Sequence, residues 1–172
     1  MKQASVLSDY DIRARLMTSP PLLEELADAN TQIQSCGVDL TVRSVAWYTT
    51  AGAVDFDNSR RVLSSTEQID WIDDWIDLPE GAYHIVYNEK VNLPRDLMAL
   101  VYPRSSLMRC GVTVHTAVWD PGYSGRGEAL LVVHNRHGFH LRKGARIAQL
   151  VFTCIGADVE RSYNGRFRGE NA

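Results

Sequence analysis

The sequence lacks the segments that would carry a chain into or across a membrane. No apolar run approaches the ~18 residues that a spanning helix needs. The opening residues, MKQASVLSDYDIRARL, lack the apolar core of a signal peptide. We therefore expect a cytoplasmic protein without a membrane partner.

Cysteine is scarce as well. Cys36, Cys110 and Cys154 stand far apart, with no CxxC pair and no histidine at ligand spacing, which disfavours a disulfide framework and structural zinc. The composition, 45% hydrophobic and 23% charged, is that of an ordinary globular protein. The 172 residues fit a single domain over residues 1–160, followed by a polar, flexible tail over residues 161–172.

The chain has little net charge, and the charge is unevenly distributed. The total of −3 argues against a nucleic-acid-binding face. Residues 1–90 carry 7 basic and 15 acidic residues (−8), whereas residues 91–172 carry 11 basic and 6 acidic residues (+5). We expect an anionic ligand to bind the second part, although the acidic part is equally compatible with a merely solvated face.

Helical periodicity is scarce, and short strand-like runs are frequent. Runs such as YHIVY, LMALVYP and EALLVVHN alternate with Gly, Pro, Asn and Asp turns, which is typical of a sandwich, jelly roll or barrel. A short helix is expected near the start, where Ser8 and Asp11 form a capping box and Pro20 follows. IDWIDDWIDLPEG, residues 69–81, is interpreted as a loop or edge segment whose tryptophans anchor it to the core.

Two polar clusters offer groups suited to binding. Asp39 in CGVDL leads into a strand-like run, and on this pattern alone it is a turn residue that bonds its own backbone. YPRSSLMRCG offers guanidiniums and hydroxyls that suit phosphate oxygens, on Arg104, Ser105, Ser106 and Arg109. A helix start capped by serine explains the same segment equally well.

Two further clusters follow later in the chain. TAVWDPGYSGRGE places Asp120 directly after an apolar run and Tyr123 three residues on, which suits a general base beside a sugar or base pocket. Asp-Pro-Gly is also a common hairpin turn. LRKGARIAQLVF places Arg142, Lys143 and Arg146 around Gly144, as in a basic turn before a buried strand. Gln149 interrupts that strand, and a buried amide there needs a partner.

The order of these motifs resembles that of the dUTPase and dCTP deaminase superfamily. GVDL, PRSSL, a strand ending in DPGY before a glycine-rich turn, and KGARIAQLVF follow one another, and the likeness extends from LSDYDIRARL to YNGRFRGE. The opening helix, QIQSCGVDL and YNGRF are most similar to the archaeal-type dUTPases. The resemblance implies a mostly β, distorted jelly roll (the β-clip) with a short N-terminal helix. It also implies a homotrimer whose active sites are shared between subunits.

The resemblance further implies roles for single residues. Asp120 deprotonates a water that attacks the α-phosphorus of dUTP. A hairpin of residues 116–123, which starts at Thr116, reads uracil through backbone groups, and Tyr123 under the sugar leaves no room for a 2′-hydroxyl. Mg²⁺ is bound mainly by the substrate, with Asp39 holding its water shell. The other substrate-binding positions are Arg104, Ser105, Ser106, Arg109 and Gln149, and Tyr163, Arg166 and Phe167 in the tail.

One strand separates the two activities of the superfamily. The deaminases carry a proton-shuttling glutamate after the DPG turn, and Val132 stands at that position here. Glu128, at the beginning of the strand, belongs to a phrase similar to the dUTPase turn. The HxE and PCxxC signature of zinc deaminases is missing too. We expect hydrolysis of dUTP; a dCTP deaminase, mono- or bifunctional, and a catalytically silent nucleotide-binding regulator are the alternatives.

Overall fold

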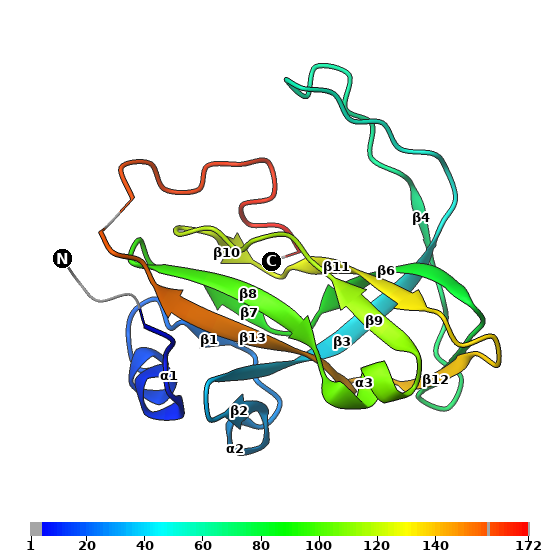
Figure 1. Ribbon diagram of the computed structural model, residues 1–172, viewed down its shortest axis with the longest axis horizontal. Helices are drawn as coiled ribbons and strands as arrows, with labels where there is room; N and C mark the ends of the chain where they lie inside the picture. The colour runs from blue at the N-terminus through cyan, green and yellow to red at the C-terminus, as the bar shows by residue number, and fades with distance from the viewer. Residues whose placement is uncertain (1–4, 158, 172) are drawn as a thin grey trace.

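Short antiparallel strands form most of the regular structure in the computed structural model, which describes residues 5–157 and 159–171 (Figure 1). The runs rich in β-branched and aromatic residues form these strands, because such side chains fit a pleated, half-buried surface. The mostly β fold predicted from the sequence is therefore confirmed. The strands are β1 (Leu23–Glu24), β2 (Ile33–Gln34), β3 (Gly37–Tyr48), β4 (Thr66–Gln68), β5 (Trp75–Leu78), β6 (Gly81–Tyr87), β7 (Lys90–Asn92), β8 (Leu97–Pro103), β9 (Val112–His115), β10 (Ser124–Gly125), β11 (Glu128–Val133), β12 (Phe139–Arg142) and β13 (Arg146–Cys154), and the helices are α1 (Asp9–Arg15), α2 (Ala29–Gln32) and α3 (Ser105–Arg109).

The long strand β3 joins two parts of the main sheet, which has the order β8-β13-β3-β6-β11-β9. Its first residues, from Val38 to Thr41, pair with β13, and its later residues, from Val42 to Trp47, pair with β6. Since β13 also pairs with β8, the GVDL motif in β3 and the PRSSL motif after β8 lie on either side of β13. The topology therefore brings two motifs together that are far apart in the sequence.

Large apolar side chains from both parts of the sheet form one core. Burial of each such side chain stabilises the fold by about 1.5–3 kcal/mol. The largest fully buried members include Leu40, Tyr83, Ile85, Tyr87, Leu97, Leu131, Leu141, Ile147 and Phe152.

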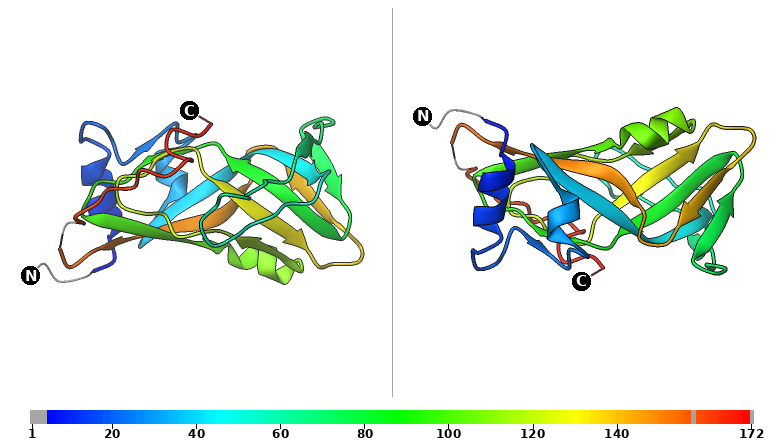
Figure 2. Two further views of the ribbon diagram at one scale, coloured as in Figure 1. Left: turned by 90° about the horizontal axis from the view of Figure 1, so that it is seen from above. Right: turned by 90° about the horizontal axis from the view of Figure 1, so that it is seen from below.

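Helix α1 begins as the sequence predicts. The Ser8 Oγ accepts a hydrogen bond from the Asp11 N–H (3.2 Å), and the Asp11 carboxylate accepts one from the Ser8 N–H (3.0 Å). Ile12 is fully buried against the core. The helix lies at one end of the molecule and the turn between β11 and β12 at the other (Figure 2). No helix within the described ranges is long and apolar enough to span a membrane.

The segment 69–81 includes an edge strand, but its tryptophans do not both anchor it. β5 pairs with β12 in a separate two-stranded sheet. Trp71 packs against the core, whereas Trp75 is 48% exposed, and Ile76 and Leu78 are buried instead. In a strand, alternate side chains point to the same face, so Ile76 and Leu78 point into the core and Trp75 points outward. The interpretation of Trp75 as an anchor was wrong.

Candidate active site

The Asp39 carboxylate, near the start of β3, forms ion pairs with the guanidiniums of Arg104 and Arg146. Its Oδ2 lies 3.1 Å from the Arg104 Nε and 3.1 Å from the Arg146 Nη1, and its side chain is 3% exposed. Burial raises the pKa of the Asp39 carboxyl, and the two cations oppose this increase by favouring the charged form. Asp39 is the centre of an ion-pair cluster inside a strand, so its interpretation as a turn residue was wrong.

Backbone contacts fix the two guanidiniums in place. Arg104 follows β8, where its N–H donates to the Ile147 carbonyl (3.1 Å), and its Nη1 donates to the Arg146 carbonyl (3.2 Å). The Arg146 Nη1 also donates to the Thr31 carbonyl (2.9 Å). Both arginine side chains remain about a third exposed, at 32% and 31%. They can therefore offer further N–H groups to an anion while they stay paired with Asp39.

Ser105 and Ser106 begin α3 with exposed side chains. The residue that caps the helix is Arg104, and no side chain accepts from the first turn, so the interpretation as a serine-capped helix was wrong. The Arg109 Nη1 donates to the Ser105 carbonyl one turn back (3.1 Å). Asp39, Arg104 and Arg146 are called the arginine cluster below. The two serines directly follow Arg104 of this cluster, where their hydroxyls can donate to phosphate oxygens.

Gln149 joins the same region through the sheet register. On β13 it stands directly opposite Asp39 of β3 and Tyr102 of β8. Residues directly opposite in antiparallel strands project to one face, so Gln149 shares a face with Asp39. The prediction of a buried amide was wrong, because Gln149 is only half-buried and keeps access to solvent.

A second group of predicted residues surrounds a small cavity of about 110 Å³. The exposed Asp120 follows Trp119, which bridges to Ala99 of β8. Residues 116–123 form a loop rather than the predicted hairpin, because β9 pairs with β11 and β10 pairs with β7. Thr116 lies in this loop, half-buried and outside the cavity lining. The cavity is lined by Ala117, Val118, Trp119, Asp120, Tyr123, Gly127, Glu128, Tyr163, Phe167 and Glu170.

Tyr123 is the buried aromatic centre of this cavity, with 7% of its surface exposed. Its ring meets Trp119 edge to face, with centroids 5.1 Å apart, and Tyr163 at 5.8 Å. Its hydroxyl donates to the Glu170 carboxylate (2.8 Å). Burial, together with the nearby Glu170 charge, raises the pKa of the Tyr123 phenol. Tyr123 therefore stays neutral and can present a flat ring to a ligand.

The described part of the tail lies over this loop (Figure 1). The Tyr163 N–H donates to the Pro121 carbonyl (2.8 Å), and the Gly169 N–H donates to a carbonyl of β10 (2.6 Å). Phe167 lines the cavity, whereas Arg166 is exposed and outside its lining. The structure thus brings two of the three predicted tail residues to the Asp120 cavity.

Glu128, which lines the cavity, is paired with a histidine. The Glu128 Oε2 lies 2.9 Å from the His84 Nε2, and this contact lowers the pKa of Glu128. Val132, four residues on in β11, stands opposite Ala82 and Thr113 and is half-buried. Among residues 5–157 and 159–171, no group of three or more His, Cys, Asp or Glu side chains could hold a metal ion.

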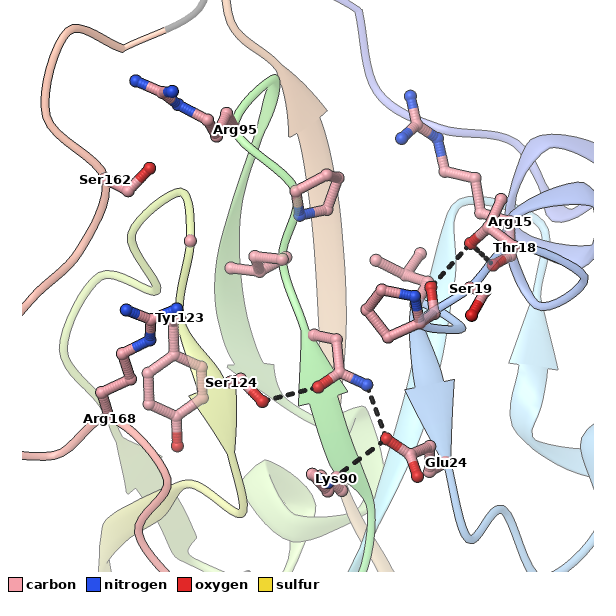
Figure 3. A pocket seen from close by; sticks show the side chains of 16 residues that line it. Arg15, Thr18, Ser19, Glu24, Lys90, Arg95, Tyr123, Ser124, Ser162 and Arg168 are labelled. Carbon is pink, nitrogen blue, oxygen red and sulfur yellow. Dashed lines mark hydrogen bonds and ion pairs between the residues drawn. The ribbon is translucent and has the colours of Figure 1, made fainter.

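A larger cavity of about 710 Å³ also contacts Tyr123 (Figure 3). Tyr123 lines it together with four basic residues, Arg15, Lys90, Arg95 and Arg168. Arg15 and Lys90 are each paired with a carboxylate, at 3.0 and 3.4 Å. Sequence reasoning missed this cavity because its cations come from separate segments, and no local pattern links them.

The arginine cluster and the Asp120 cavity are separate in one chain. Trp119 contacts β8 at Ala99, whereas Arg104 follows the end of β8 five residues later, or roughly 16 Å at the rise of a strand. Neither cavity described above is lined by Arg104 or Arg146.

Comparison with known proteins identifies the class to which this fold and site belong. A family described as dCTP deaminase-like matches residues 6–155, and the chain belongs to this family. A relative from Methanococcoides burtonii, named probable deoxyuridine 5′-triphosphate nucleotidohydrolase, is 47% identical over 97% of this chain and 99% of its own length. A relative of the same name from Archaeoglobus fulgidus is 47% identical over 97% of this chain and 98% of its own.

A solved structure supports the fold. The 2′-deoxycytidine 5′-triphosphate deaminase from Agrobacterium tumefaciens superposes with a TM-score of 0.68 at 22% identity, covering 90% of this chain and 49% of that one. The jelly roll predicted from the motifs is therefore confirmed as the fold of this chain.

Proposed function

We propose that the protein hydrolyses dUTP to dUMP and pyrophosphate, which removes dUTP from the nucleotide pool and supplies dUMP for dTMP synthesis. The main observation behind this proposal is that Arg104 and Arg146 share one buried carboxylate, Asp39. The exposed hydroxyls of Ser105 and Ser106 directly follow Arg104. Fixed guanidiniums and hydroxyls suit the oxygens of a triphosphate. The names of the full-length relatives support the same substrate.

Asp120 is the proposed general base. Its carboxylate is exposed at the mouth of an aromatic-lined cavity, where it can accept a proton from a water molecule. The water oxygen bonds to the α-phosphorus, the bond from that phosphorus to the bridging oxygen breaks, and pyrophosphate leaves. The proposed contacts to the phosphates come from Arg104, Ser105, Ser106, Arg109 and Gln149.

The residues present fit a Mg²⁺ ion that arrives with the substrate. Both guanidiniums contact the Oδ2 of Asp39, which leaves its Oδ1 for a metal-bound water. The ion would be held mainly by phosphate oxygens, as Mg²⁺ commonly is. When bound, it neutralises charge on the triphosphate.

The aromatic cavity is the proposed site for the base and the sugar. The Tyr123 ring would pack against the sugar, and backbone groups of the loop 116–123 would read uracil. Tyr163, Arg166 and Phe167 would close over the bound nucleotide and exclude water from the reacting phosphate. The present position of Tyr163 and Phe167 at the cavity supports this role.

The proposed assembly is a cytoplasmic homotrimer with active sites at subunit interfaces and without a nucleic-acid partner. The separation of the arginine cluster from the Asp120 cavity supports shared sites, since a neighbouring subunit could place its own cluster beside this cavity. Within each subunit, the domain would extend to residue 160 and the tail would begin at residue 161; residues 1–4, 158 and 172 lie outside the described residues.

A product assay tests the proposed reaction. The protein is incubated with dUTP and with dCTP in the presence of Mg²⁺, and pyrophosphate and ammonia are measured separately. We expect pyrophosphate from dUTP and no ammonia from dCTP, because Val132 cannot move protons at the position of the deaminase glutamate. Ammonia in proportion to dCTP would support the deaminase alternative, and binding without any product would support the silent regulator.

A further inference from the structure

Glu89 is fully buried although it carries a carboxyl group. It lies between β6 and β7 and has no exposed surface. None of the ion pairs found among the described residues includes Glu89, so no cation offsets its burial. A buried carboxylate without a cation is tolerated only where hydrogen bonds replace its lost hydration. The surroundings of Glu89 must therefore supply donors.

Three donors reach the Glu89 carboxylate. Thr41 provides two of them, its N–H at 2.9 Å and its Oγ1 at 2.6 Å, and Gln32 provides the third through Nε2 at 2.7 Å. Gln32 is itself 2% exposed, and the same Nε2 donates to the carbonyl of Asp39 at 2.9 Å. Glu89 is thus linked to the β3 backbone on both sides of Leu40.

The sheet is irregular at the same place. The pairing of β3 with β13 shifts register between Arg146 and Ala148, opposite Thr41 and Leu40. The pairing of β3 with β6 shifts register after Val42. The regular ladder is therefore interrupted on both sides of this stretch of β3, and the contacts of Glu89 add a further constraint beside the remaining backbone bonds.

We propose that Glu89 is a positioning residue for the phosphate-binding cluster. It holds the β3 backbone through Thr41 and Gln32, so that Asp39 presents the guanidiniums of Arg104 and Arg146 at a fixed place. This inference rests on the proposed function, since it assumes that these arginines bind the triphosphate. A glutamine cannot replace Glu89 fully, because its amide NH₂ would face a donor instead of accepting from it.

The test compares a ligand that has phosphates with one that lacks them. Binding of the non-hydrolysable analogue dUpNHpp and of deoxyuridine is measured for the wild-type chain and for Glu89→Gln. We expect the analogue to bind at least about tenfold more weakly to the variant, with deoxyuridine binding changed by less than about twofold. Equal weakening of both ligands, or no change in either, would overturn the positioning role.

A matched control and a milder variant complete the experiment. Glu80→Gln alters an exposed carboxylate between β5 and β6 that lines neither cavity, so both affinities should stay at the wild-type value. If Glu89→Gln does not fold, Thr41→Val carries the test, because it keeps the N–H donor to Glu89 and removes only the hydroxyl, which donates to Glu89 and accepts from the Asn88 Nδ2. It should weaken the analogue selectively, and a non-selective loss would count against the proposal.

The variant Arg104→Gln distinguishes a failure of the proposed phosphate site from a failure of the positioning role of Glu89. If this variant binds dUpNHpp as tightly as the wild-type chain, the proposed phosphate site itself fails. If it weakens the analogue but Glu89→Gln does not, only the positioning role fails. If both weaken it, the double variant should lose less than the sum of the two single losses, because Glu89 acts through the cluster to which Arg104 belongs.

Discussion

The phenolic hydroxyl of Tyr123 donates a 2.8 Å hydrogen bond to the carboxylate of Glu170, which lies 47 residues further along the chain. This contact joins the ring that we place under the sugar to the tail that we expect to close over the nucleotide. Glu170 also lines the Asp120 cavity, which has a volume of only about 110 Å³ with the tail in place. We therefore expect the tail to shift when a nucleotide enters the proposed site.

The docking of the tail should depend on pH through Glu170. Burial raises the pKa of the Glu170 carboxyl; Tyr123 and His84 oppose the increase, and the charge of Glu128 adds to it. A carboxyl whose pKa is raised on docking favours the docked state at low pH, and this contribution is lost as the pH rises through the raised pKa. Docking should therefore weaken as the pH rises above the ordinary pKa of a glutamate and through the raised pKa of Glu170.

Hydrogen exchange of the tail amides, corrected for intrinsic rates, measures this effect. Protection of residues 163–171 should fall as the pH rises in the wild-type chain and stay nearly constant in Glu170→Gln. The same pH dependence in both proteins would show that another group is responsible.

Asp120→Asn should abolish turnover without abolishing binding. The amide keeps the shape of the side chain but cannot take a proton, so kcat should fall by about 10²–10⁴. The Kd for dUpNHpp should change by no more than a few fold. Asp57→Asn, which changes an exposed carboxyl that lines neither cavity, serves as the control. An Asp120→Asn enzyme with a rate within a few fold of the wild type would exclude Asp120 as the base.

Tyr123→Ala should reduce the discrimination between dUTP and UTP. A ring packed against the sugar leaves no volume for a 2′-hydroxyl and offers it no partner, so we expect the wild-type chain to reject UTP by several kcal/mol. In the variant, the ratio of kcat/KM for dUTP to kcat/KM for UTP should fall by at least about tenfold, mainly because kcat/KM for dUTP decreases. Tyr10→Ala, on the exposed face of α1, should leave the ratio unchanged. An unchanged ratio in Tyr123→Ala would remove Tyr123 from the sugar pocket.

Truncation after Arg161 should leave the fold and the assembly intact, because most of the removed residues are exposed. Turnover of dUTP should fall by at least about tenfold, or ~1.4 kcal/mol of transition-state stabilisation. Sedimentation and steady-state kinetics measure the two outcomes. If the truncated protein hydrolysed dUTP at the wild-type rate, Tyr163, Arg166 and Phe167 would have no catalytic role.

Local signals in the sequence predicted local structure well. Ser8 and Asp11 lie three residues apart, and their capping box needs no other part of the chain. The strand-forming runs likewise became strands. Residues 116–123 did not form the predicted hairpin, because β9 and β10 found their partners in β11 and β7, and no local turn signal reports such distant pairing.

The sequence identified residues of the candidate site, but it did not predict the contacts between them. The motifs pointed to Asp39 and Arg104, yet their ion pair joins residues 65 positions apart and depends on β13 between their strands. Arg146 was assigned only to a basic turn, although it contacts the same oxygen. Glu89 gave no signal, because a glutamate between Asn88 and Lys90 has the pattern of a solvated turn. Its burial follows from the tertiary packing around β3.

The most direct test of the central claim is hydrolysis of dUTP in ¹⁸O-labelled water with Mg²⁺, followed by mass analysis of both products. Attack of water on the α-phosphorus predicts one labelled oxygen in dUMP and none in pyrophosphate. Label in the pyrophosphate, or the absence of both products, would contradict the account.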